Sequence, residues 1–109
     1  MVTFRKRTWD DDDPIFVISV AARILRVHSQ TLRYYEKEGL LEPARSRGNI
    51  RLYSQRDIER LQRIKTLTED LGINLAGVQV VLQMMDRIEH LERDIRQLKG
   101  KLSQHQKLE

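Results

Sequence analysis

The sequence predicts a mainly α fold, a winged helix-turn-helix domain followed by a C-terminal dimerisation coiled-coil helix. Three observations point to it: two short helical segments joined by a tight turn, a Gly-Asn turn signal between apolar runs, and apolar residues at heptad spacing near the C-terminus. We expect a flexible N-terminal arm at 1–14, the winged-helix domain at 15–85, and the coiled-coil helix with its tail at 86–109.

The arm is predicted from its lack of apolar periodicity. It combines a basic triplet, Arg5 to Arg7, with an acidic run, Asp10 to Asp13, and a proline follows. Such a polar segment has little apolar surface to bury, so we expect a flexible or partly ordered tail rather than part of the core.

The next segment, FVISVAARILRV, predicts a short strand and then a helix with Ser19 as its N-cap. Ser29 can cap a second helix that runs through Glu38 and is ended by Gly39. Two short helices joined by so tight a turn form a helix-turn-helix.

A small hairpin is predicted after these helices. Pro43 disfavours helix, and Gly48-Asn49 is a turn signal with apolar residues on both sides. Ser54 and Asp57 then resemble a capping box with the shorter acid, which predicts the start of a third helix.

Asn74 can cap a further helix, whose apolar positions settle into alternating steps of three and four residues. These steps define a heptad seam, and His105 interrupts it at the next position. The seam consists of Ile88, Leu91, Ile95, Leu98 and Leu102. Because so polar a helix cannot bury this stripe against a small domain, we expect a homodimer through the seam. The alternative is a helix that folds back on its own domain.

Composition limits the function further. The net charge is +4, and residues 15–53 hold seven basic and three acidic groups, a surplus that favours a polyanionic partner. Without cysteine there is no disulfide or thiolate metal site, and the three histidines lack ligand spacing, so no metal or other cofactor is expected. The sequence contains no catalytic set of residues and no phosphate-binding loop, so we do not expect an enzyme. No membrane-spanning run or signal peptide is evident, so we expect a cytoplasmic protein.

The helix starting at Ser29 has two faces. Leu32 and Tyr35 share one face and should point into the core, while donor-bearing residues cover the rest. Arginine and glutamine can read base edges, and hydroxyls suit phosphates, so we expect this helix and the hairpin to bind double-stranded DNA. Tyr53 could either pack or contact a phosphate. The candidate DNA-binding residues are Arg23, Gln30, Thr31, Arg33, Tyr34, Lys37, Arg47, Asn49, Arg51 and Tyr53.

The runs TLRYYEKEGLL, PARSRGNIRLYS and DIERLQRIKTL resemble, in order, the helix-turn-helix, wing and third helix of the MerR family of dimeric bacterial transcription regulators. Within that family, VISVAA, HSQTLR and LGINLAGVQVVL resemble the HspR heat-shock repressors, including the histidine before the recognition helix. The resemblance implies repression of chaperone genes at an inverted-repeat operator in the nucleoid, with the chaperone DnaK as a co-repressor.

Two departures keep other readings open. HspR proteins usually have proline where Ser29 stands, and often one aromatic where this chain has Tyr34-Tyr35. The runs PARSRGNIRLYS and NLAGV also resemble the GlnR and TnrA nitrogen regulators. Another MerR-type regulator that answers to a protein or metabolite is therefore an alternative. So is a protein-only chaperone modulator resembling CbpM, although such a module has no need for a basic segment.

Overall fold

The computed structural model describes residues 10–108, without the side chain of Leu108. It divides into two compact units, which are described separately: unit 1 ends at Ile73 and unit 2 begins at Asn74. The predicted basic triplet of the arm lies outside the described residues. In the part of the chain that is described, no helix has an apolar stretch long enough to cross a membrane.

The acidic end of the predicted arm contacts the start of a helix of unit 1. Residues 10–13 form a turn in which the Asp12 amide donates to Asp10 Oδ1 at 2.8 Å. The Arg56 amide donates to the Asp11 carbonyl at 2.9 Å, and its Nε lies 2.5 Å from Asp12 Oδ1. These carboxylates therefore lie near the N-terminus of the third helix, where the helix dipole favours negative charge.

The first two helices form the predicted helix-turn-helix. Strand β1 (Phe16–Val17) leads directly into α1 (Ile18–Leu25), so Val17 occupies the N-cap position and the expected cap at Ser19 is wrong. Helix α2 (Ser29–Lys37) has His28 at its N-cap, one residue before the predicted Ser29. Gly39 follows with a φ of 78°, which confirms the glycine end of this helix.

The turn between α1 and α2 is closed by backbone and side-chain contacts. Arg26 adopts the left-handed conformation, with a φ of 58°, and the Val27 amide donates to the Ala22 carbonyl at 3.0 Å. Lys65 Nζ donates to the Leu25 carbonyl at 2.8 Å, so a side chain from the third helix satisfies the end of α1.

The predicted hairpin is confirmed, and β1 extends it to a three-stranded antiparallel sheet of order β1-β3-β2. Strand β2 (Ala44–Arg45) pairs with β3 (Arg51–Tyr53), and Arg45 lies directly opposite Arg51. The connecting turn is closed by the Asn49 amide, which donates to the Ser46 carbonyl at 2.9 Å, and Asn49 has a φ of 61°. We call residues 44–53 the wing and residues 46–50 its tip.

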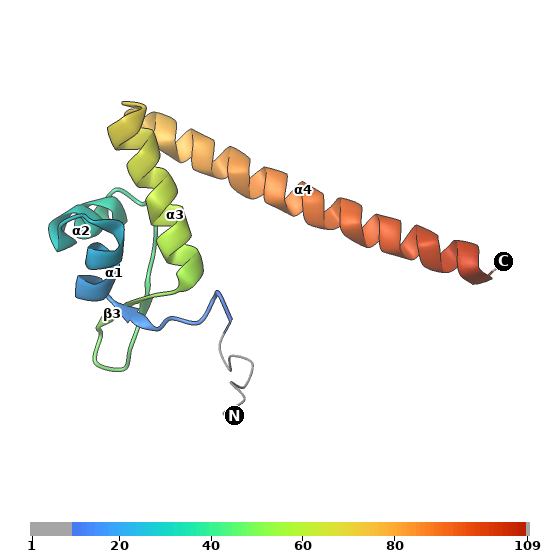
Figure 1. Cartoon of the computed structure of the whole chain (residues 1–109), viewed down its shortest axis with the longest axis horizontal. Coiled ribbons are helices and arrows are strands. Elements are labelled where there is room, and N and C mark those ends of the chain that lie inside the picture. The colour runs from blue at the N-terminus through green and yellow to red at the C-terminus, as the bar shows by residue number, and fades with distance from the viewer. Residues whose placement is uncertain (1–9, 109) are drawn as a thin grey trace, which may run out of the picture. The chain divides into compact units, whose positions relative to one another are not determined.

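Helix α3 (Gln55–Lys65) begins with the predicted capping box, because Ser54 and Asp57 exchange side-chain-to-backbone hydrogen bonds of 3.0 Å. It continues into a π-helical turn, η1 (Thr66–Asp70), in which Thr68 Oγ1 donates to the Ile64 carbonyl at 2.9 Å. Figure 1 shows α1 and α2 beside α3. The buried hydrophobic residues of unit 1 are Ala21, Ala22, Leu25, Leu32, Tyr35, Leu40, Leu41, Tyr53, Ile58, Leu61 and Ile64.

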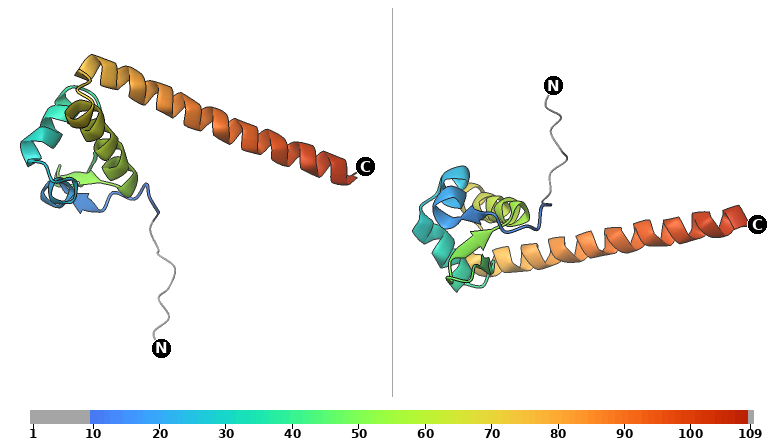
Figure 2. Two further views of the ribbon diagram at one scale, coloured as in Figure 1. Left: turned by 45° about the horizontal axis from the view of Figure 1, so that its top comes forward. Right: turned by 90° about the horizontal axis from the view of Figure 1, so that it is seen from below.

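Unit 2 is one helix, α4 (Leu75–Leu108), of 34 residues, which at 1.5 Å per residue is about 51 Å long. The predicted cap is confirmed, since the Gly77 amide donates to Asn74 Oδ1 at 2.9 Å. Figures 1 and 2 show it as an uninterrupted helix. It passes without a break through residue 85, where we expected the domain to end.

Candidate nucleic-acid interface

Helix α2 presents the two faces that its sequence predicts. Leu32 and Tyr35 are buried, at 2% and 5% exposure, and Tyr35 Oη lies 3.4 Å from Thr68 Oγ1. The adjacent Tyr34 is 49% exposed. One face therefore fixes the helix to unit 1 and leaves the other open to solvent.

The open face of α2 carries donors of several kinds. We call it the recognition face, and it consists of Gln30, Thr31, Arg33, Tyr34 and Lys37. All of these are exposed except the half-buried Thr31. Arg33 Nη1 donates to Gln30 Oε1 at 3.4 Å, the long end of the hydrogen-bond range. So weak a contact leaves the guanidinium and the amide able to bind another partner.

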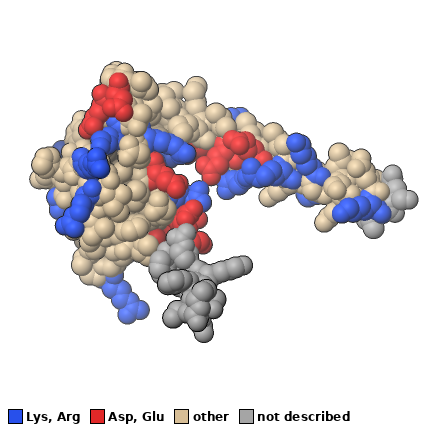
Figure 3. All heavy atoms as spheres, viewed as in Figure 1, with Lys and Arg blue, Asp and Glu red and all other residues tan. Residues whose placement is uncertain are grey.

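The wing places further basic and amide groups beside α2. Arg47 and Asn49 are exposed at its tip, and Arg23 is exposed on α1. Figure 3 shows Lys and Arg side chains at several places on the visible face of unit 1, with acidic side chains among them. Along α4 it shows an acidic cluster, with basic side chains toward the C-terminal end. The structure thus exposes most of the predicted DNA-binding residues.

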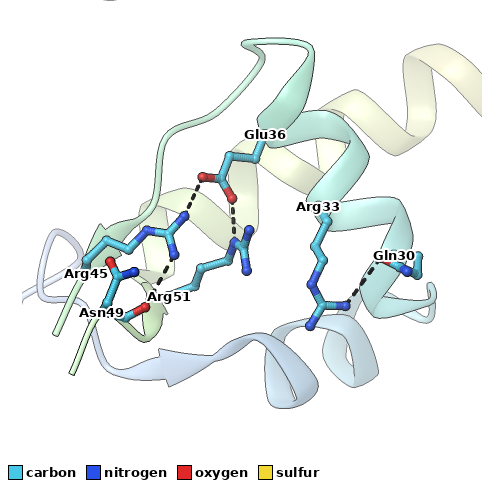
Figure 4. A network of polar contacts seen from close by, with 6 residues as sticks. All are labelled: Gln30, Arg33, Glu36, Arg45, Asn49 and Arg51. Atoms are coloured by element: carbon cyan, nitrogen blue, oxygen red, sulfur yellow. Dashed lines mark hydrogen bonds and ion pairs between the residues drawn. The ribbon is translucent and has the colours of Figure 1, made fainter.

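Glu36, which the sequence did not single out, joins α2 to the wing. Its Oε1 accepts from Arg51 Nε at 2.5 Å, and its Oε2 accepts from Arg45 Nη2 at 2.9 Å. Arg45 Nη1 also donates to the Asn49 carbonyl at 3.4 Å (Figure 4). We call Glu36, Arg45 and Arg51 the Glu36 bridge.

The electrostatics of the bridge follow from these contacts. The hydrogen bond from Arg51 lowers the pKa of Glu36, and partial burial opposes this change. The same hydrogen bond raises the pKa of Arg51. Glu36 therefore stays ionised, and Arg51, predicted as a DNA contact, already has an anionic partner within the protein.

Tyr53 requires a correction. Its side chain is fully buried, at 0% exposure, so in this conformation it belongs to the core and cannot contact DNA. Among residues 10–108 its hydroxyl finds no hydrogen-bond partner, and burial raises the pKa of that hydroxyl. A strand of three residues is too short for its alternation to show which side chains point inward, so the sequence left this choice open.

The predicted seam of α4 is an exposed apolar stripe in the isolated chain. Its members are between 47% and 63% exposed, namely Ile88, Leu91, Ile95, Leu98 and Leu102. Met84, four residues before Ile88 and 60% exposed, extends the stripe, and we missed it although the heptad spacing includes it. Among the described residues, no group of His, Cys, Asp and Glu could hold a metal ion.

Comparison with known proteins adds to this geometry. The family model described as MerR HTH family regulatory protein matches residues 16–85. The provisionally named heat shock protein HspR of Streptomyces coelicolor is 44% identical over 82 residues, which cover 75% of this chain and 54% of the relative. The chain thus spans about half the length of this curated relative.

Two solved structures have a similar fold. The transcription regulator PbrR691 from Ralstonia metallidurans, solved with lead(II), is 31% identical with a TM-score of 0.63, over 86% of this chain and 80% of that one. HiNmlR, a regulator without a sensor domain solved on promoter DNA, is 20% identical with a TM-score of 0.58, over 84% and 76% of the two chains.

Proposed function

Because the chain belongs to the MerR family of helix-turn-helix regulators, we propose that it represses heat-shock (chaperone) genes by binding an inverted-repeat operator as a homodimer. Regulators of this family bind DNA, typically as dimers, and are not enzymes.

The heat-shock assignment rests mainly on the similarity to HspR, which extends over three quarters of this chain. The recognition face supports a base-reading role, because it combines an arginine and a glutamine that suit guanine and adenine edges. The wing tip supports a phosphate-binding or minor-groove role through Arg47. Of the DNA contacts expected from the sequence, the proposal leaves out Tyr53, which is buried, and Arg51, which binds Glu36. It keeps Arg23, Gln30, Thr31, Arg33, Tyr34, Lys37, Arg47 and Asn49.

The exposed seam of α4 supports the proposed homodimer. A half-exposed apolar stripe on a polar helix gains stability when a second copy covers it, and two copies present two helix-turn-helices to two half-sites. An inverted repeat is the DNA sequence that matches such a two-fold dimer. The protein would act in the cytoplasm at the nucleoid, with DnaK as the co-repressor that reports the load of unfolded protein.

Genome-wide mapping of bound DNA before and after heat shock tests the proposal. We expect sites containing an inverted repeat upstream of chaperone operons, and loss of occupancy on heating. A variant with Arg33→Ala and Arg47→Ala serves as the control, because it removes two proposed contacts without altering the core. Sites upstream of nitrogen-assimilation genes, or occupancy that heat does not change, would contradict the heat-shock assignment. Depleting DnaK at constant temperature should also lower occupancy, and unchanged occupancy would exclude it as co-repressor.

A further inference from the structure

Arg45 and Arg51 of the wing face one another, and the Glu36 carboxylate compensates their charges. Arg45 and Arg51 are directly opposite in the β2–β3 pair, where two like charges destabilise the pairing. Glu36 from α2 supplies one oxygen to each of them, at 2.9 and 2.5 Å. The wing therefore depends on an acid from another element for the stability of its own strand pair.

The bridge also fixes the wing to α2. Glu36 lies three residues after Arg33 on the same helix, and its side chain is only 21% exposed. From Glu36 the contacts pass through Arg45 to the carbonyl of Asn49 at the wing tip (Figure 4). One carboxylate thus connects the helix that carries the recognition face to the tip of the wing.

We propose that Glu36 is a specificity-determining residue of the DNA-binding surface, although it does not touch DNA. It holds the wing in register with the recognition face. It also keeps Arg45 and Arg51 from binding phosphates of any DNA sequence. This inference rests on the proposed DNA-binding function. The Glu36 bridge has a net charge of +1, because it contains two arginines and one carboxylate. Removing the carboxylate leaves the positive charges of Arg45 and Arg51 without their counter-ion and breaks the contact between the wing and α2.

The main test compares Glu36→Gln with the wild type in fluorescence anisotropy titrations, on operator and on random DNA, at several salt concentrations. We expect Glu36→Gln to bind random DNA more tightly, and the operator-to-random ratio to fall several-fold. The slope of log affinity against log salt on random DNA should steepen by about 0.9 for each arginine that reaches a phosphate.

A matched control separates the bridge from net charge. Glu42→Gln makes the same charge change in the loop after α2, and no described hydrogen bond or ion pair joins Glu42 to either arginine. Identical behaviour of Glu36→Gln and Glu42→Gln would overturn the proposal. Arg45→Gln breaks the bridge from the wing side while removing a positive charge, so it should lower the operator-to-random ratio without tightening random binding.

The position of the wing can be measured without DNA. The chain has no cysteine, so spin labels at Lys37→Cys and Arg47→Cys report the distance between α2 and the wing tip. The distance distribution should broaden in Glu36→Gln and Arg45→Gln and stay narrow in Glu42→Gln. A narrow distribution in all three variants would overturn the proposal. A wild type that binds operator and random DNA equally would instead contradict the proposed function, while the labels still test the bridge.

Discussion

Replacing two seam leucines by glutamate, Leu91→Glu with Leu98→Glu, should convert the proposed dimer to monomers. Burying an exposed leucine or isoleucine completely gains about 1.5–3 kcal/mol. The five predicted seam side chains are 47% to 63% exposed in the single chain, so each gains about 1 kcal/mol when a partner covers it. The double variant alters four of the ten such side chains in a dimer.

The loss is therefore about 4 kcal/mol of association free energy, and the dimer should dissociate about a thousand times more readily. The charges introduced into the seam add a desolvation cost in the same direction. Sedimentation velocity at micromolar concentration should show monomers, and binding to a two-half-site operator should be lost because each monomer reaches one half-site.

The matched control is Gln97→Glu with Gln104→Glu, which adds the same two charges to α4 at heptad positions away from the seam. This variant should remain dimeric and bind the operator. If the Leu91→Glu, Leu98→Glu variant sediments as a dimer, or if both double variants dissociate alike, the seam is not the dimer interface.

Three further predictions concern unit 1. Arg33→Ala should cost about 1–3 kcal/mol on the operator and relax specificity at one position, whereas an equal loss on random DNA would indicate a phosphate contact. Tyr53→Phe removes a buried hydroxyl that has no partner in the described part of the chain. Urea denaturation should therefore show stability unchanged or raised by about 1 kcal/mol, with operator affinity unaltered. Because the folded-state pKa of Glu36 is lowered from 4.5, its contribution to stability is present above pH 4.5 and is lost as pH falls below it. The free energy of unfolding of Glu36→Gln should therefore fall less steeply with decreasing pH in this range than that of the wild type. Equal pH slopes in the two proteins would contradict the stabilising role of the Glu36 carboxylate.

The elements that sequence predicted well are those set by local chemistry. The capping box of Ser54 and Asp57, the glycine at 39 and the turn at Gly48-Asn49 each depend on residues within a few positions of one another. The two faces of α2 followed from helical spacing alone, since Leu32 and Tyr35 lie on one side. Such signals need no knowledge of the rest of the fold.

Features that depend on distant residues were missed. The pairing of β1 with β3 joins two very short strands far apart in the chain, and it places the helix start at Ile18 rather than after Ser19. Glu36 was overlooked because its partners lie 9 and 15 residues away and meet it only once the wing has folded. The burial of Tyr53 likewise became visible only when β3 was seen between its two neighbours.

The Glu36 bridge also has a consequence for how the sequence can change during evolution. An acid at position 36 and two facing arginines at 45 and 51 form one electrostatic set, so a change at any one position alters what the other two can tolerate. A descendant that loses the acid should survive most readily when it also loses one of the arginines. Relatives of this protein are therefore expected to vary at these three positions together, even where the residues of the recognition face diverge to suit a different operator.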